Sequence, residues 1–181
     1  MQKWDAPDVQ GADLDVLQGC GQILQRSILA IEIEVEFAQM YKNQPLFSDV
    51  DQFLTPLGFH LFNIETRAGG SRSPRAISPI TSNKKGQLLW GDALYFRDPI
   101  DENAHLVTQN PDQIIKIACI ADILGYVDYG LELLHYLTLK YGDNPDYNFA
   151  PEIVKILNQF PNLVEQGLEN LPIVSTLSSY L

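Results

Sequence analysis

The stretch Asp8-Val9-Gln10-Gly11-Ala12-Asp13-Leu14-Asp15-Val16-Leu17 decides how the rest of the chain is interpreted. An acid and a turn glycine precede apolar residues at helical spacing, which predicts the end of a strand turning into a helix. Ligands of open α/β sheets bind at the carboxyl ends of the strands, where side chains leave the packed layer. The stretch therefore predicts a strand-end site with Asp8 as its first candidate. Periodicity alone leaves a second interpretation open, in which Asp8 or Asp13 caps the following helix.

Composition limits the class of protein and its partners. The chain has 181 residues, 45% apolar and 19% charged, as in soluble globular domains. Its net charge of −11 argues against nucleic acid, because such binding depends on Lys and Arg. No apolar run approaches the roughly 18 residues of a membrane helix, and no signal-peptide core follows Met1. We expect a cytoplasmic protein with no membrane partner. Cys20 and Cys119 lack metal or disulfide spacing and are predicted to be buried thiols.

The first hundred residues alternate helical and strand patterns, as α/β folds do. We expect a helix over residues 13 to 25, with Gly19 and Gly21 breaking or ending it and with Leu14, Leu17, Ile23 and Leu24 facing inward. A second helix is expected from residue 48, with Ser48 as the cap. Strands are expected over residues 27 to 37, 59 to 66 and 88 to 97, the last two paired with each other. The first strand should bury its N-terminal half and extend its C-terminal half beyond the sheet edge.

The remaining residues, 99 to 181, have a helical pattern. Asn110 is expected to cap a helix that ends at Gly125, and a second helix should follow it to form a hairpin. Shorter helices are expected after residue 150, with residues 175 to 181 frayed. The chain is therefore predicted to divide into residues 1 to 98 and a helical extension over residues 99 to 181.

Several groups of charged residues have two interpretations. Glu32, Glu34 and Glu36 alternate along the first strand and form either a solvated face or a ligand site, with Glu34 the candidate for a role. The segment from 67 to 86 carries five basic residues and is either an anion clamp or a surface loop. The three histidines share no metal-ligand spacing, so no metal site is predicted. They are His60, His105 and His135.

Five blocks of the chain resemble FkbM-type methyltransferases, in the order in which that family carries them. The blocks are Asp8-Val9-Gln10-Gly11-Ala12-Asp13-Leu14-Asp15-Val16-Leu17-Gln18-Gly19, Ile33-Glu34-Val35-Glu36-Phe37, Tyr41-Lys42-Asn43-Gln44-Pro45-Leu46, Leu57-Gly58-Phe59-His60-Leu61-Phe62 and Trp90-Gly91-Asp92-Ala93-Leu94-Tyr95-Phe96-Arg97. Together they span residues 8 to 98, and the helical region is similar to extensions of some members.

This resemblance implies an α/β fold in which residues 1 to 98 form part of a Rossmann-like, doubly wound methyltransferase sheet. The strands would be similar to the family's fourth to seventh, with Asp8 closing the fourth. The resemblance also implies S-adenosylmethionine as cofactor and a small hydroxyl acceptor, such as a sugar or secondary metabolite. The site residues that it implies are catalytic Asp8 and Glu34, cofactor-binding Gln10 and Gly11, and substrate-binding Tyr41 and Lys42.

The sequence also departs from the family's pattern. The glycine-rich first strand-to-helix turn, and the acid that ends the second strand and holds the cofactor ribose, have no counterpart here. We therefore expect a truncated C-terminal portion of an O-methyltransferase that is inactive alone. The alternative is a non-catalytic interaction module, which self-associates or binds a partner through an exposed sheet edge and the helical tail.

Overall fold

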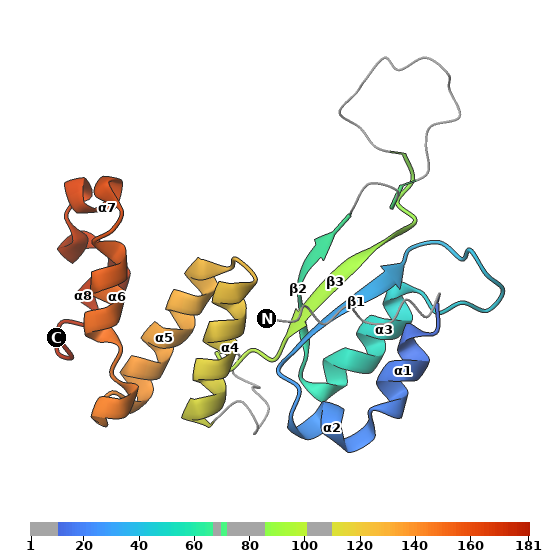
Figure 1. Cartoon of the computed structure of the whole chain (residues 1–181), viewed down its shortest axis with the longest axis horizontal. Helices are drawn as coiled ribbons and strands as arrows, with labels where there is room; N and C mark the ends of the chain where they lie inside the picture. The colour runs from blue at the N-terminus through green and yellow to red at the C-terminus, as the bar shows by residue number, and fades with distance from the viewer. Residues whose placement is uncertain (1–10, 67–69, 72–85, 101–109) are drawn as a thin grey trace, which may run out of the picture. The chain divides into compact units, whose positions relative to one another are not determined.

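A computed structural model describes residues 11–66, 70–71, 86–100 and 110–181. The chain forms two compact units, Met1–Arg97 and Asp98–Leu181, which we call the sheet unit and the helical unit (Figure 1). In the described ranges, no helix combines the length and apolar character that crossing a membrane requires.

The sheet unit contains a three-stranded sheet. Its elements are α1 (Asp13–Gly19), α2 (Gly21–Arg26), β1 (Ala30–Glu36), α3 (Phe47–Leu54), the 3-10 helix η1 (Thr55–Leu57), β2 (His60–Glu65) and β3 (Trp90–Phe96). The strand order is β1-β3-β2 with both pairs antiparallel, so β1 and β2 run parallel on either side of β3. The predicted pairing of the second and third strands and the mixed α/β class are both confirmed.

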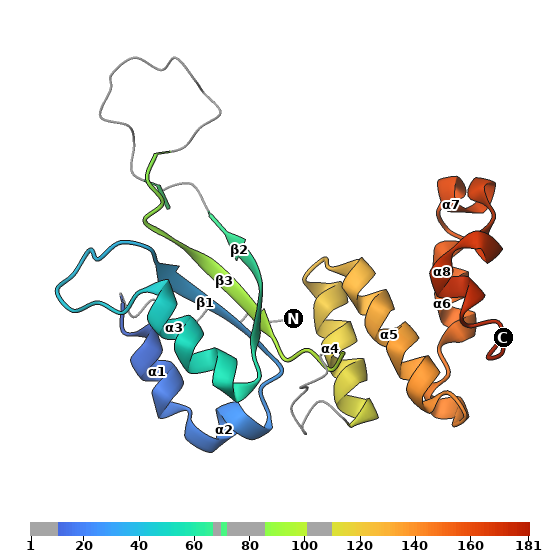
Figure 2. The ribbon, with the colours of Figure 1, turned by 180° about the vertical axis from the view of Figure 1, so that it is seen from behind.

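The helices of this unit pack against one face of the sheet (Figures 1 and 2). Alternate residues Ile33 and Val35 of β1 and Ala93 and Tyr95 of β3 point into the resulting core. The helices supply the apolar residues Leu17, Leu24, Val50 and Leu54. Because β1 alternates, its three glutamates occupy the opposite face.

A buried cation, Arg97, joins several chain segments by hydrogen bonds at one end of the sheet. Its side chain is fully buried and lies over the Phe59 ring, 4.2 Å from the ring centroid. The guanidinium donates hydrogen bonds of 2.6 to 3.1 Å to the carbonyl oxygens of Ile28, Leu57, Leu24 and Gln25. Four backbone acceptors thereby replace the water that the charge loses on burial. Arg97 thus joins the end of α2, the start of β1 and the end of η1.

The helical unit is built on a hairpin of two long helices. Its elements are α4 (Pro111–Ile123), α5 (Val127–Tyr141), η3 (Pro145–Tyr147), α6 (Ala150–Leu157), α7 (Pro161–Gln166), η4 (Leu168–Asn170) and α8 (Pro172–Ser175). As predicted, the Asn110 side chain caps α4 by accepting from the Asp112 N–H at 2.9 Å. Gly125 has φ +87°, which ends that helix in the left-handed region. The hairpin prediction is confirmed.

Two local predictions for the helices of the sheet unit are wrong. The helix does break at the predicted place, since α1 ends at Gly19 and α2 begins at Gly21 with φ +50°. Leu24 is buried as expected, but Ile23 is 65% exposed. Leu46, not Ser48, is the N-cap of α3, because the Asp49 carboxylate accepts from the Leu46 N–H at 2.7 Å.

The burial of β1 is the reverse of the prediction. Glu32, near the start of the strand, is exposed, whereas Val35 and Glu36 at its end are buried. All seven residues of β1 pair with β3, from Ala30 opposite Phe96 to Glu36 opposite Trp90. The C-terminal half therefore does not extend beyond the sheet, since β3 accompanies it to its end.

Other predictions fail because tertiary packing overrides the local pattern. The strand expected over residues 59 to 66 is interrupted by a register shift between Leu61 and Asn63. Cys119 is exposed, and Cys20 is half-buried. Leu177 is fully buried in the core of the helical unit, so the segment after residue 175 is not frayed.

The described sheet has three strands, and the helices α1, α2 and α3 pack on one of its faces, so a doubly wound arrangement is not shown. Asp8, which the resemblance places at the end of a further strand, lies outside the described residues.

Candidate functional site

The end of β1 presents a buried carboxylate, Glu36. Its exposed fraction is 4%, and its Oε1 accepts a hydrogen bond from Gln44 Nε2 at 2.7 Å. Gln44 is also buried and belongs to the loop that connects β1 to α3. The strand end and this loop are therefore joined by two polar side chains that are removed from water together.

The Gln44 amide also fixes the loop itself. Its Oε1 accepts hydrogen bonds from the backbone N–H groups of Met40, at 3.0 Å, and Tyr41, at 3.1 Å. Both ends of the amide are thus used, as a buried polar group requires. The result is a loop held in one conformation beside the Glu36 carboxylate.

The turn before α1 packs against the same amide. Gly11 has φ +89°, and a Cβ at this position would lie 2.5 Å from Gln44 Nε2. A side chain there would both collide with Gln44 and strain the backbone. The glycine is therefore required by the close approach of the turn to Gln44. Three segments meet at this point: the turn, the end of β1 and the loop after it.

The electrostatics of this cluster raise the pKa of Glu36 to about 7. Burial is the main cause, because it disfavours the charged form, and the negative charges of Asp13 and Glu34 add to it. The hydrogen bonds from Gln44 and from the backbone oppose the rise only in part. Glu36 consequently changes its charge near neutral pH, which is the range in which a carboxylate serves best as a proton acceptor.

Glu34 lies two residues before Glu36, on the same face of β1, and is half-buried. Its cross-strand partner is Asp92 on β3, and Asp92 is in turn paired with Glu65 on β2. Directly opposed residues of antiparallel strands share a face. Three carboxylates therefore form a row across the sheet, on the face opposite α1, α2 and α3. In the described residues, no group of three or more metal-ligating side chains has a geometry that could hold an ion.

The structure places some of the predicted site residues and not others. Asp8 and Gln10 lie outside the described residues. Gly11 lies in the cluster, where its free space is filled by Gln44. Tyr41 and Lys42 belong to the loop and have exposed side chains, and the Tyr41 N–H takes part in the Gln44 network. The catalytic, cofactor and substrate roles assigned to these residues and to Glu34 stay predictions.

The other candidates of the sequence do not join this cluster. His60 is exposed on β2, and His135 Nε2 lies 2.7 Å from Thr176 Oγ1 in the helical unit. His105 and the five basic residues between 67 and 86 lie outside the described residues.

Sequence reasoning missed Glu36 and Gln44 as the centre of the cluster. Strand alternation assigns Glu36 to the same face as the exposed Glu32, and nothing in the periodicity separates the two. The available signal was position, because Glu36 is the last acid before the strand gives way to a polar loop. The partner of Glu36 could not be found this way, since Gln44 reaches it only after the loop folds back.

Comparison with known proteins identifies the segment that carries this cluster. Residues 7–61 match the family model of the methyltransferase FkbM domain, which is a partial match to the chain. No curated protein and no solved structure matches it. The matched residues include α1, β1, the Gln44 loop and the start of β2, whereas β3 and the helical unit lie beyond them. Residues 7–61 are thus similar to the methyltransferase FkbM domain.

Proposed function

We propose that the sheet unit carries the acceptor side of an FkbM-type O-methyltransferase site, with Glu36 as the group that accepts the hydroxyl proton. One observation carries this proposal: a buried carboxylate with its pKa raised to about 7, fixed by Gln44 within the family-matched residues. An alcohol oxygen is a weak nucleophile until its proton is removed. A carboxylate that is half ionised near neutral pH is suited to this removal.

The acceptor class follows from the family resemblance and from the surroundings of Glu36. We expect a small hydroxyl compound, such as a sugar or secondary metabolite, to bind beside Tyr41 and Lys42, whose exposed side chains belong to the loop that contains Gln44. Glu34 and Asp13 then act as positioning residues, because their negative charges keep Glu36 protonatable at neutral pH. Asp8 and Gln10, which precede the described turn, complete the group of residues that the resemblance assigns to this site.

The described residues do not fit the family's cofactor, S-adenosylmethionine. The space beside Gly11 is occupied by the Gln44 side chain, whose Nε2 lies within 2.5 Å of the position that a Cβ would take, so it forms no cradle for a ligand. The sequence also has no glycine-rich strand-to-helix turn of the family type. We therefore propose that this 181-residue chain does not bind the cofactor alone and is inactive in isolation.

Isothermal titration with S-adenosylmethionine tests the cofactor part of the proposal. We expect no measurable heat of binding in the micromolar range at protein concentrations that detect it. Micromolar affinity would show that the chain holds the cofactor by residues other than those described, and the proposed inactivity would be wrong.

An NMR titration tests the acceptor part without the cofactor. The Gln44 side-chain amide and the Glu36 carboxyl carbon should shift when small polyols and sugars are added, with a pH dependence centred near 7. Glu36→Gln should abolish that pH dependence, while Glu32→Gln, a matched change on the exposed part of β1, should leave it intact. The role of Glu36 as proton acceptor would be contradicted if polyols shifted other resonances but not those of Gln44. It would also be contradicted if Glu36 titrated near the usual value of about 4.3.

A second candidate function is a non-catalytic interaction module that self-associates or binds a partner. Its supporting observation is the edge position of β2, where Leu61 is 40% and Phe62 38% exposed. Apolar side chains on an edge strand favour pairing with another chain, although the bulge at this point restricts it. Sedimentation velocity tests the idea: a monodisperse dimer that Leu61→Lys dissociates supports it, and a monomer at all concentrations excludes self-association.

A further inference from the structure

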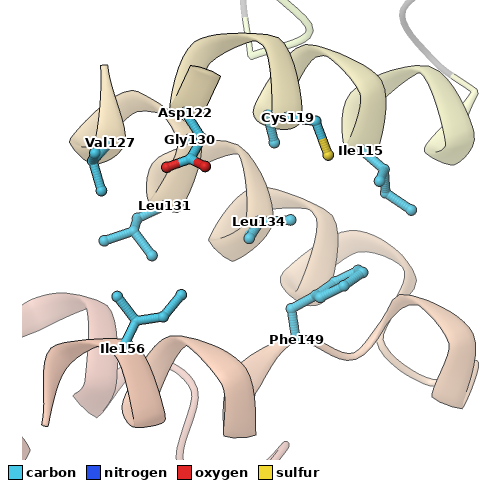
Figure 3. A pocket seen from close by; sticks show the side chains of 10 residues that line it. Ile115, Cys119, Asp122, Val127, Gly130, Leu131, Leu134, Phe149 and Ile156 are labelled. Atoms are coloured by element: carbon cyan, nitrogen blue, oxygen red, sulfur yellow. The ribbon is translucent and has the colours of Figure 1, made fainter. Parts of the chain in front are cut away.

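An apolar hollow of about 240 Å³ lies in the helical unit, between the α4–α5 hairpin and α6 (Figure 3). Leu131 and Leu134 of α5 face it, and Phe149 and Ile156 point toward them from the opposite side. Cys119 of α4 adds an exposed thiol to the wall. Nearly all of the lining is apolar, so water in this hollow has few polar partners and a hydrophobic group could replace it favourably.

A second hollow, of about 320 Å³, adjoins the first. The two share Val127 and Leu131, and the second extends from the start of α5 to Leu157 at the end of α6 and to Phe160 beyond it. We call the pair the α5 groove. Val127 is 41% and Phe160 50% exposed, so apolar surface remains in contact with water along its length. A contiguous apolar surface of this kind marks a binding site more often than scattered exposed side chains do.

The charged residues of the groove all have one sign. Asp122 lines the first hollow, where its carboxylate projects from α4 toward α5, and Asp128 lines the second. Among the described residues that line the two hollows there is no lysine or arginine. The sequence from Asp98 to Leu181 carries twelve acidic and three basic residues, a net charge of −9 out of −11 for the chain. The surroundings of the groove therefore attract cations and repel anions.

We propose that the α5 groove binds a basic amphipathic helix of a partner protein. Apolar side chains at positions i and i+3 or i+4 of that helix would fill the two adjoining hollows, and flanking lysines or arginines would face Asp122 and Asp128. The acidic charge of the unit selects the occupant, because it disfavours an acidic peptide, an anionic lipid and a second copy of this acidic unit. This inference rests on the second candidate function, the interaction module, and specifies the kind of partner that the module would bind. It does not depend on methyl transfer.

Fluorescence anisotropy with the full chain tests the proposal. The probe is a labelled amphipathic peptide of about 18 leucine and lysine residues, patterned so that the leucines occupy one helix face. The controls are a scrambled peptide of the same composition and a leucine–glutamate peptide of the same pattern. We expect saturable binding of the first peptide at low salt, at least tenfold weaker binding of both controls, and weakening with added salt.

Variants locate the binding. Val127→Asp places a charge in the floor shared by both hollows, at a partly exposed position that tolerates the change, and should weaken binding at least tenfold. Combining Asp122→Asn with Asp128→Asn should weaken binding by roughly three- to tenfold, through loss of the two rim charges. The matched control, Asp143→Asn with Asp146→Asn, makes the same change of net charge at exposed positions outside the groove. It should alter affinity by less than about twofold.

Three results would overturn the proposal. The first is that the basic peptide shows no saturable binding to the wild type or to any variant, although circular dichroism shows that all of them are equally folded. The second is equal weakening by the groove pair and the control pair, which would mean attraction by net charge alone. The third is a dimer in sedimentation velocity that Val127→Asp dissociates while the peptide does not bind, which would make a second copy the occupant. A dimer that only Leu61→Lys dissociates would bear on the sheet edge and not on the groove.

Discussion

The two units of the chain handle charge in opposite ways. The sheet unit carries eleven acidic and nine basic residues, close to balance, and it buries Arg97 and Glu36. The helical unit has a net charge of −9, and its only buried polar residue in the described ranges is Thr138. Net charge is thus a poor guide to where charges act. Among the described residues, the unit with little net charge buries two charged side chains, and the unit with a large net charge buries none.

The contrast has a physical cause. A buried charge must either find partners or become neutral. Arg97 finds four carbonyl oxygens, whereas for Glu36 the charged form is disfavoured and the pKa rises to about 7. Thr138 needs neither, because its hydroxyl donates to the Leu134 carbonyl and accepts from the Phe149 N–H. Charges of the helical unit stay hydrated and act over a distance, which suits recognition of a partner.

The largest effect is expected at Arg97. Arg97→Met keeps the apolar stem but removes the donor of four carbonyl oxygens, so the free energy of unfolding of the sheet unit should fall by about 3–5 kcal/mol. Both tryptophans, Trp4 and Trp90, belong to this unit, so tryptophan fluorescence during urea unfolding reports it selectively. Lys140→Met, a matched change at an exposed position of the helical unit, should leave the transition in place. An unchanged midpoint for Arg97→Met would contradict a structural role of the buried cation.

The helical unit should respond most strongly to loss of apolar volume. Leu177→Ala removes a fully buried side chain from the core that it shares with Ala150 and Ile153, and should cost about 2–4 kcal/mol. Circular dichroism during thermal unfolding measures the loss. Leu181→Ala, at a 62% exposed position in the same segment, is the control and should change stability little. Equal, small effects at both positions would mean that the C-terminal segment is frayed after all.

The next largest effect concerns pH, because Glu36 should make the stability of the sheet unit depend on pH. The pKa of Glu36 is raised in the folded state, so between about pH 4.5 and pH 7 the folded chain binds more protons than the unfolded one. The stability of the sheet unit should therefore decrease by about 2 kcal/mol as pH rises through this range, because ionising Glu36 favours unfolding. Glu36→Gln should remove this component, and Glu32→Gln should not. A wild-type profile that coincides with that of Glu36→Gln would exclude the raised pKa.

The smallest effects concern helix capping, where the two units again differ. Asn110→Ala removes the side-chain acceptor that caps α4 and should cost the helical unit about 1 kcal/mol. Ser48→Ala in the sheet unit should cost less than about 0.5 kcal/mol, because the N-cap of α3 is Leu46, with Asp49 bonded to it. Urea unfolding followed by fluorescence and by circular dichroism checks both. A loss of about 1 kcal/mol for Ser48→Ala, as a capping residue would give, would return that role to the serine.

The sequence by itself determined much of the architecture. Helix and strand periodicity located every long element, and Asn110 and Gly125 marked the ends of α4. The first four of the five family blocks coincide, to within one residue, with the match over residues 7–61, and the fifth lies beyond it. These features depend on neighbours along the chain, which a sequence displays directly. They also led to the end of β1 as the place to look for a site.

Only the tertiary structure decided which side chains meet there. Glu32 and Glu36 are equivalent in the alternating pattern, yet one is exposed and the other is buried against Gln44. The antiparallel β3 between β1 and β2, the four acceptors of Arg97 and the two hollows along α5 are likewise contacts between segments distant in sequence. Burial and pKa depend on such contacts, because desolvation is set by everything packed around a group and not by its place in a periodic pattern.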